Sequence, residues 1–376
     1  MILKLLKELI AIPSVNPSYG GPGEAELKSF VLGWLEDHGI RANTQEALPG
    51  RRNILARLGS DDEPGTLLDA HMDTVGVDGW AEGSPYEPCE KNGRLYGRGS
   101  CDTKASLAVF MTVAAYFAKN PSALKRPLVF AATVDEEATQ LGAYEVVKLK
   151  DEYKIEAAIA GEPTGSELVL AHKGVCRFIL TTSGKAAHGS TPHLGESAIL
   201  KMNRILHKLE GLGERLANAD TQDEMEKGTL NIGLIKGGIG FNVVPDKCLI
   251  EIDRRLGISE TAQDAEAELQ EIADAEPGSI LENHIVRSAV NTSADSWFPR
   301  ELLAAAEAAG VSTRFSQALY MTNAVAYAEA GLPAVVFGPG DIAQAHKNDE
   351  YIEISELQKS YDILVSYFSR EPTRDE

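Results

Sequence analysis

The chain has 376 residues, of which 43% are hydrophobic and 24% are charged, a balance typical of a globular protein and not of a disordered one. This length exceeds what one ordinary core uses, so two domains are expected. With 56 Asp and Glu against 36 Lys and Arg, the formal net charge is −20, and the chain lacks the cluster of basic residues that nucleic-acid binding requires.

The first element is an amphipathic helix that ends near Pro13. Lys4, Lys7 and Glu8 interrupt its apolar residues, and no small-residue cleavage site follows, so a signal peptide is not indicated. No later stretch approaches the roughly 18 apolar residues of a membrane span. The cysteines lack any CxxC spacing, which favours reduced thiols in a cytoplasmic protein without membrane contacts; they are Cys89, Cys101, Cys176 and Cys248.

Helical patterns and short apolar runs then alternate as far as residue 172. Helices are expected at 24–39 and 103–118, and buried strands at 53–58, 65–71, 127–134 and 157–163. Strands that are apolar on both faces and alternate with helices predict an α/β domain, in which a mostly parallel central sheet has helices on both faces.

Residues 173–286 follow a different pattern, with elements in the order β-α-β-β-α-β. The expected elements are strand 175–183, helix 195–212, strands 228–238 and 247–255, helix 259–273 and strand 279–286. This order is the split βαβ arrangement of small α+β domains. The α/β pattern resumes with helix 301–310, strand 332–340 and helix 354–368. We therefore expect a discontinuous domain of residues 1–172 and 287–376, with 173–286 inserted into it.

Acids and histidines follow the ends of the buried strands of the larger domain. They are His71, the triplet Asp135, Glu136 and Glu137, Glu162 and His346, with Asp102 where glycines give way to a helix. Each of them alone is more typical of a turn or a helix cap, and the triplet alone indicates a solvated turn. Ligands of such sheets bind at the carboxyl ends of the strands. Together at that edge, these side chains would form an anionic cluster that only bound cations make tolerable.

Two histidines with several carboxylates, and without a matching thiolate, favour zinc or a similar divalent ion. The acids are too many for one tetrahedral ion, whereas two ions about 3.5 to 4 Å apart can share a bridging carboxylate. One acid is then left as a proton carrier, and the residues alone do not say which. In "HMDT", Asp73 leans to the same side as His71 and could fix its tautomer, although a capped turn has equal weight.

Taken together, these segments resemble the M20 family of two-zinc amidohydrolases and peptidases over nearly the whole chain. The motifs are "DAHMDTV", "LYGRGSCDTK", "VDEEATQLGA", "AGEPT", "HKGVCRFILTTSGKAAHGSTPHLGESAI", "NVVPDKCLIEIDRR" and "GPGDIAQAHKNDEYI". Within the family, the resemblance is greatest to the deacetylases of acetylornithine and acetylcitrulline.

The resemblance implies a role for each site residue. His71 and Glu162 would hold one metal ion and Glu137 and His346 the other, with Asp102 bridging them through a loop that ends in a cis Asp102–Thr103 peptide. The ions would be zinc, with cobalt or manganese as alternatives. Asp73 would orient His71, and Glu136 would be the general base. His188 of the inserted domain would reach the cleft of a partner subunit and polarise the scissile carbonyl, which implies a homodimer. Asn242 and Arg255 would bind the carboxylate and the backbone polar groups of the substrate.

The implied activity is removal of the acetyl group from N-acetylornithine or N-acetylcitrulline in arginine biosynthesis. Glu136 would take a proton from a metal-activated water and pass it to the leaving amine. Alternatives within the family are a succinyl-diaminopimelate desuccinylase, a carboxypeptidase and an aminoacylase. From a different functional class, the alternative is a catalytically inactive member that serves as a metal-binding scaffold.

Two segments depart from the usual deacetylase pattern. "DRRLG" lacks the proline that usually follows the arginine, and Asn323 stands where family members commonly carry an acid. Both segments are expected to border the substrate pocket. Cys101 is expected to be a small packing residue, and Asp135 a supporting residue without an assigned role.

Overall fold

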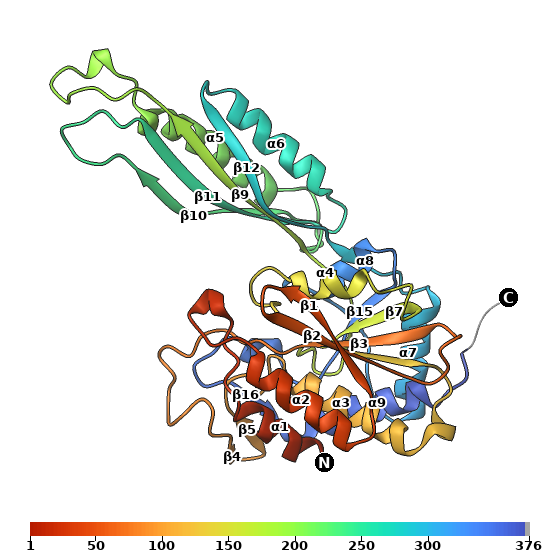
Figure 1. Ribbon diagram of the computed structural model, residues 1–376. Coiled ribbons are helices and arrows are strands. Elements are labelled where there is room, and N and C mark those ends of the chain that lie inside the picture. Colours follow the sequence, from red (N-terminus) through yellow and green to blue (C-terminus); the bar gives the residue numbers. More distant parts are fainter. Residues whose placement is uncertain (373–376) are drawn as a thin grey trace. The chain divides into compact units, whose positions relative to one another are not determined.

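The computed structural model describes residues 1–372, which form two compact units (Figure 1). The first unit comprises Met1–Leu170, Thr292–Gln317 and the chain from Thr322 on. The second comprises Ala171–Asn291 and Ala318–Met321. The second unit is thus inserted into the first, and the sequence pattern gave no sign that the four residues from Ala318 group with it.

The first unit is built on a mixed sheet. Its strand order is β1-β2-β6-β3-β7-β15-β8-β13, with β14 beside β8. The bounds are β1 (Ala42–Leu48), β2 (Arg51–Leu58), β3 (Gly65–His71), β6 (Leu128–Thr133), β7 (Ile155–Ala160), β8 (Leu168–His172), β13 (Val290–Asn291), β14 (Phe315–Ala318) and β15 (Ala334–Val336). The four central strands, β6, β3, β7 and β15, are parallel to one another. The strands on both sides of this group run antiparallel to their neighbours. The expected α/β class is confirmed.

Helices cover both faces of this sheet, and Figure 1 shows α4 and α8 on the face opposite to α1, α2, α3 and α9. The bounds are α1 (Ile2–Ile10), α2 (Ala25–Asp37), α3 (Lys104–Lys119), α4 (Leu141–Val147), α7 (Trp297–Ala308), α8 (Ala324–Glu329) and α9 (Ile354–Phe368). A small second sheet joins β4 (Cys89–Lys91), β5 (Arg94–Tyr96) and β16 (Tyr351–Glu353). No described helix is long and apolar enough to cross a membrane.

The core of the first unit explains why its parallel strands are apolar throughout. Every residue of β3 and β6 is buried, and so is almost every residue of α3, which packs on them. Phe110 of α3 and Phe130 of β6 belong to this core, and burying one such side chain stabilises the fold by about 1.5 to 3 kcal/mol. The carboxyl ends of β3, β6, β7 and β15 consequently lie along one firmly held edge.

The second unit is an antiparallel sheet with two helices on one face (Figure 1). Its elements are β9 (Gly174–Ser183), α5 (Ala198–Ala217), β10 (Thr229–Gly237), β11 (Lys247–Leu256), α6 (Ala262–Asp274) and β12 (Ser279–Arg287). The sheet order is β10-β11-β9-β12. Phe178 and Leu180 alternate with outward-facing residues along β9 and pack with Leu209 of α5 and Leu269 of α6. The β-α-β-β-α-β order expected from the sequence is thus observed.

Candidate metal centre

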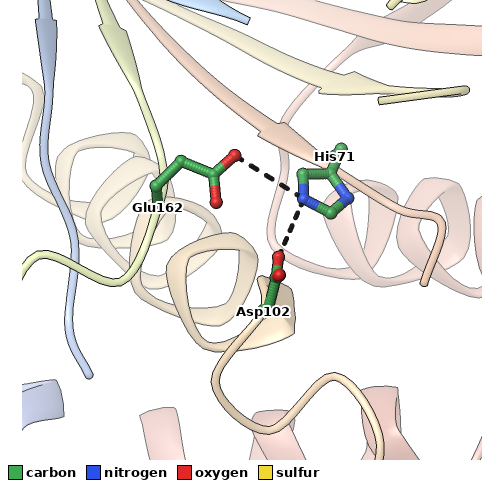
Figure 2. A group of neighbouring side chains, drawn as sticks. All are labelled: His71, Asp102 and Glu162. Atoms are coloured by element: carbon green, nitrogen blue, oxygen red, sulfur yellow. Dashed lines mark hydrogen bonds and ion pairs between the residues drawn. The ribbon is translucent and has the colours of Figure 1, made fainter. Parts of the chain in front are cut away.

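Two groups of potential ligands meet at the carboxyl edge of the parallel strands, and they share one residue. His71, Asp102 and Glu162 have ligand atoms within 4.8 Å of one another, and so do Asp102, Glu137 and His346. His71 Nε2 lies 3.2 Å from Asp102 Oδ1 and 3.7 Å from Glu162 Oε1 (Figure 2). His346 Nε2 lies 3.2 Å from Asp102 Oδ2 and 3.1 Å from Glu137 Oε2. Each oxygen of Asp102 therefore faces one histidine.

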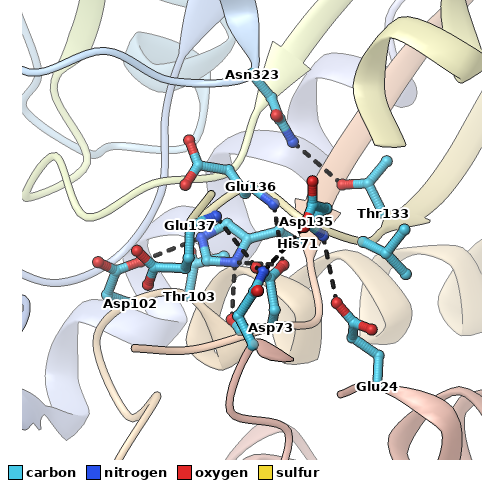
Figure 3. Close-up of polar contacts among 12 residues, drawn as sticks. Glu24, His71, Asp73, Asp102, Thr103, Thr133, Asp135, Glu136, Glu137 and Asn323 are labelled. Atoms are coloured by element: carbon cyan, nitrogen blue, oxygen red, sulfur yellow. Dashed lines mark hydrogen bonds and ion pairs between the residues drawn. The ribbon is translucent and has the colours of Figure 1, made fainter. Parts of the chain in front are cut away.

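The orientation of His71 is set by residues just beyond β3. Its Nδ1 lies 2.9 Å from the backbone oxygen of Asp73 and 3.6 Å from that residue's Oδ1. The Asp73 carboxylate accepts the backbone N–H groups of Glu136 and Glu137, both at 3.1 Å (Figure 3). Asp73 thus fixes the imidazole through its backbone and the acidic loop through its side chain, so that Nε2 faces the cluster.

Asp135 is an anchor of the acidic loop and not a member of either ligand group. It adopts φ 70°, and its Oδ1 accepts hydrogen bonds from Arg51 Nη1 at 2.5 Å and Asn16 Nδ2 at 3.1 Å. The same Asn16 amide donates to Asp73 Oδ2 at 2.8 Å. Arg51 also pairs with Glu24. This network, in which Arg51 faces the carboxylates of Glu24 and Asp135, supports the loop that carries Glu136 and Glu137.

Glu136 lies beside both groups without belonging to either. Its Oε1 accepts a hydrogen bond of 3.0 Å from Gln140 Nε2, and its backbone is held by Asp73. Burial, with the nearby Glu137 and Asp102 charges, raises the pKa of Glu136 to about 8 against the opposing effect of His71. A carboxylate with a raised pKa near a metal-ligand cluster is suited to accept and return a proton near neutral pH.

Without cations, only protons offset the negative charges of the cluster. The pKa values of its members are shifted as a result. Burial raises the pKa of Glu137 to about 7, with a further rise from Asp102, and both causes lift that of Glu162 well above its usual value. Burial opposes protonation of His71, yet its acidic neighbours raise its pKa overall, and hydrogen bonds to Asp102 and Glu137 raise that of His346 to about 11. The acids outnumber the histidines, so ionising all of the acids would leave excess negative charge, and without cations the cluster takes up protons instead.

This arrangement fits divalent cations. Glu137 Oε2 lies 3.1 Å from His346 Nε2, and its Oε1 is buried without a hydrogen-bond partner among residues 1–372, so this ligand candidate has an unused acceptor. Imidazole nitrogens with carboxylate oxygens form the donor set of zinc and related ions, and a shared carboxylate between two groups is the pattern of a two-metal site. Cys101 lies outside both groups, with its Sγ 3.4 Å from the backbone oxygen of Asp341, so its thiol packs there.

The remaining site residues expected from the sequence belong to the second unit. His188 and Asn242 are exposed on two adjoining loops, because Gly189 N donates to Asn242 O at 2.7 Å and His188 pairs with Val243. Arg255 is at the other end of β11, where it pairs with Val175. The second unit therefore brings His188 and Asn242 together and holds Arg255 apart from them.

Asn323 is part of a buried hydrogen-bond network with residues of β3 and β6. It is buried, and its Nδ2 donates to Asp69 Oδ2 at 3.0 Å and Thr133 Oγ1 at 3.1 Å. Tyr327 donates to the same Asp69 carboxylate at 2.8 Å. Burial raises the pKa of Asp69 to about 6, so an amide at position 323 avoids a second buried acid beside it. Asn323 therefore supports the strand ends from within.

This chain is similar to known proteins both in sequence and in fold. The model of peptidase family M20/M25/M40 matches residues 67–370. An acetylornithine deacetylase from Myxococcus xanthus is 32% identical over 375 residues, covering 96% of this chain and 94% of that protein. An M20 family metallo-carboxypeptidase from Sulfolobus solfataricus has a similar fold, with a TM-score of 0.80, 18% identity and 98% coverage of both chains. A dinuclear metal-binding M20 peptidase from Bacillus subtilis has a TM-score of 0.71 at 16% identity, covering 98% of this chain and 96% of its own.

Proposed function

This chain belongs to peptidase family M20/M25/M40 and is a metal-dependent amidohydrolase, and from that premise we propose that it deacetylates an N-acetyl amino acid, N-acetylornithine or N-acetylcitrulline, in arginine biosynthesis. The observation that supports a two-metal hydrolase is that the two ligand groups share Asp102. The likeness to acetylornithine deacetylases over 96% of the chain supports the acyl amino acid as substrate. A cytoplasmic location belongs to the same proposal.

Two zinc ions are the proposed cofactors, with cobalt or manganese as alternatives. His71 and Glu162 would hold one ion, Glu137 and His346 the other, and Asp102 would be a ligand of both. Divalent ions in such a site lower the pKa of water and polarise a carbonyl group.

Glu136 is the proposed proton carrier, because it lies beside both groups and is not used by either. Its carboxylate accepts the proton of the attacking water and returns it to the amine nitrogen as the amide bond breaks, so acetate and a free amino acid are released. Gln140 and the backbone contact with Asp73 hold Glu136 in place for both transfers.

We propose that residues 1–172 and 287–376 are the catalytic domain, and that 173–286 form a lid and dimerisation domain. Lys247 and Arg255 are eight residues apart on β11, so Arg255 is roughly 25 Å from the end that carries Asn242 and His188. A small amino acid derivative cannot span that distance. If all three residues bind one substrate, His188 and Asn242 come from one subunit and Arg255 from the other.

The surface beside Asn242 supports such a homodimer. Ile239 is 89% exposed and Phe241 is completely exposed, and both are on the loop that follows β10, an edge strand of its sheet. Large apolar side chains exposed next to an unpaired strand edge are typical of a surface that another chain covers.

Substrate profiling tests the proposal. The zinc-loaded protein is assayed with acetylornithine, acetylcitrulline, succinyl-diaminopimelate and a dipeptide, and kcat/KM is compared across the four. We expect one of the acetyl compounds to exceed the others by at least about tenfold, which corresponds to about 1.4 kcal/mol in transition-state binding. Preference for the succinyl compound or the dipeptide would reassign the substrate within the family, and no turnover of any acylated amino acid would favour the metal-binding scaffold.

A further inference from the structure

Glu350 lies directly behind the shared ligand Asp102, and although the segment "GPGDIAQAHKNDEYI" contains it, the sequence assigned it no role. It is completely buried and follows His346 by four residues. The strand after it, β16, pairs with β5, and the loop that carries Asp102 begins where β5 ends. The segment with His346 and the loop with Asp102 are therefore side by side at Glu350.

The Glu350 carboxylate accepts four hydrogen bonds, all from the loop of Asp102. Oε1 accepts from the backbone N–H groups of Cys101 at 2.7 Å and Asp102 at 2.9 Å. Oε2 accepts from Arg98 Nη1 at 2.7 Å and from the backbone of Gly99 at 2.9 Å. One side chain thus fixes the backbone of the residue that both ligand groups share.

Only a carboxylate can satisfy this set of donors. It offers two acceptor oxygens, whereas the amide of glutamine offers one acceptor and places an NH₂ group against two of the donors. A buried N–H group left without its acceptor costs about 1 to 3 kcal/mol, so the loop would shift in order to recover its hydrogen bonds. A shift of the Asp102 backbone would move both of its oxygens at once.

We propose that Glu350 is a positioning residue of the metal centre, which holds Asp102 so that each of its oxygens serves one ligand group and thereby sets the metal affinity of both groups together. Glu350 itself is not a ligand and touches neither substrate nor metal. The inference rests on the proposed two-metal function, but it concerns metal binding and not the identity of the substrate.

The experiment measures zinc binding by the full chain without substrate. Apo-protein is titrated with Zn²⁺ in competition with a chromophoric chelator, for the wild type, Glu350→Gln and Glu350→Asp. We expect Glu350→Gln to weaken binding at both sites by about tenfold or more, because residues that hold a ligand typically contribute 10- to 100-fold to affinity. Stoichiometry should remain at two ions at high zinc, and Glu350→Asp, which retains the charge, should recover part of the loss.

Glu301→Gln is the matched control, since Glu301 is also a buried carboxylate paired with an arginine, Arg126, but is located on α7. It should cost stability without altering either zinc affinity. Activity provides a second readout: excess zinc should restore the kcat of Glu350→Gln to near the wild-type value with KM unchanged. Unchanged zinc affinities in Glu350→Gln, weakening confined to one site, or equal weakening in Glu301→Gln would each overturn the inference. Two tight sites in an enzyme that lacks deacetylase activity would overturn only the proposed substrate.

Discussion

His71 in the first unit and His188 in the second are presented to their surroundings in opposite ways. His71 is 1% exposed, with one ring nitrogen at the backbone of Asp73 and the other between Asp102 and Glu162. His188 is exposed on a loop, and its Nδ1 meets the hydroxyl of Ser190, two residues further on. The first histidine is preorganised by its own chain, whereas the second is free to meet groups that its own unit does not supply.

The difference between the buried His71 and the exposed His188 indicates which part of the proposed chemistry one subunit can perform. A buried, hydrogen-bonded side chain costs little entropy when a cation or substrate binds, and an exposed one must be ordered at that moment. Metal binding should therefore survive changes in the second unit, while turnover should depend on both units.

The largest effect is expected for Glu136→Gln. The amide cannot carry the proton, so kcat should fall by about 10²- to 10⁴-fold while two zinc ions remain bound. Steady-state kinetics and metal analysis of the same preparation provide the measurement. Loss of zinc would make Glu136 a ligand, and activity close to wild type would remove it from the mechanism.

His188→Ala should be nearly as damaging to turnover, by about 10²- to 10³-fold, because a donor to the carbonyl oxygen is lost, while zinc affinity stays unchanged. Mixing this variant with Glu136→Gln sharpens the comparison between the units. If His188 acts in the partner subunit, a mixed dimer has one complete site, and an equimolar exchanged mixture should recover about a quarter of wild-type activity, since half of the randomly formed dimers are mixed. No recovery after subunit exchange would place His188 in its own subunit's reaction.

Asp135→Asn tests the anchor of the acidic loop. Removing one of the two carboxylates that face the partly buried Arg51, while Glu24 remains, should lower the free energy of unfolding by roughly 1.5 to 3 kcal/mol, measured by urea denaturation of the zinc-free protein. Glu46→Gln is the matched control, because its ion pair with Arg52 is exposed and should contribute less than about 1 kcal/mol. Equal effects in the two variants would deny Asp135 its supporting role.

The smallest effect concerns His172, a fully buried histidine of the second unit. Burial lowers its pKa to about 4, so the folded protein binds fewer protons than the unfolded chain between pH 4 and about 6.5. Its contribution to stability is complete above pH 6.5 and is lost as pH falls, by roughly 2 kcal/mol at pH 5. With a chelator present to keep the protein metal-free, the free energy of unfolding should fall less for His172→Asn than for the wild type between pH 7.5 and pH 5. An identical pH dependence of stability in the variant and the wild type would contradict the lowered pKa of His172.

The sequence located the candidate ligands because each of them follows the end of an apolar strand or opens a helix, and the fold brings those ends to one edge. It could not identify the residues that hold them. Asp135 meets Arg51, which is 84 positions away, and Glu350 meets Asp102 across 248 positions. Local patterns carry no information about such contacts, so Asp135 had no assigned role and Glu350 was missed. The burial of Asn323 depends in the same way on Asp69, 254 positions earlier.

The position of β15 in the sheet has a consequence for the order in which the chain folds during synthesis. β15 is between β7 and β8 in the sheet, yet its residues are made after the whole second unit, more than 160 residues later than β8. At about 5 to 20 residues per second, the ribosome needs on the order of 10 to 30 s to cover that interval. Through that time β7 and β8 lack the strand that lies between them, although β7 already has β3 on its other side, and the second unit, nearly complete in sequence, has the chance to fold first. His346 emerges last of the ligands, so metal loading of the second group is necessarily a late event in the life of a newly made chain.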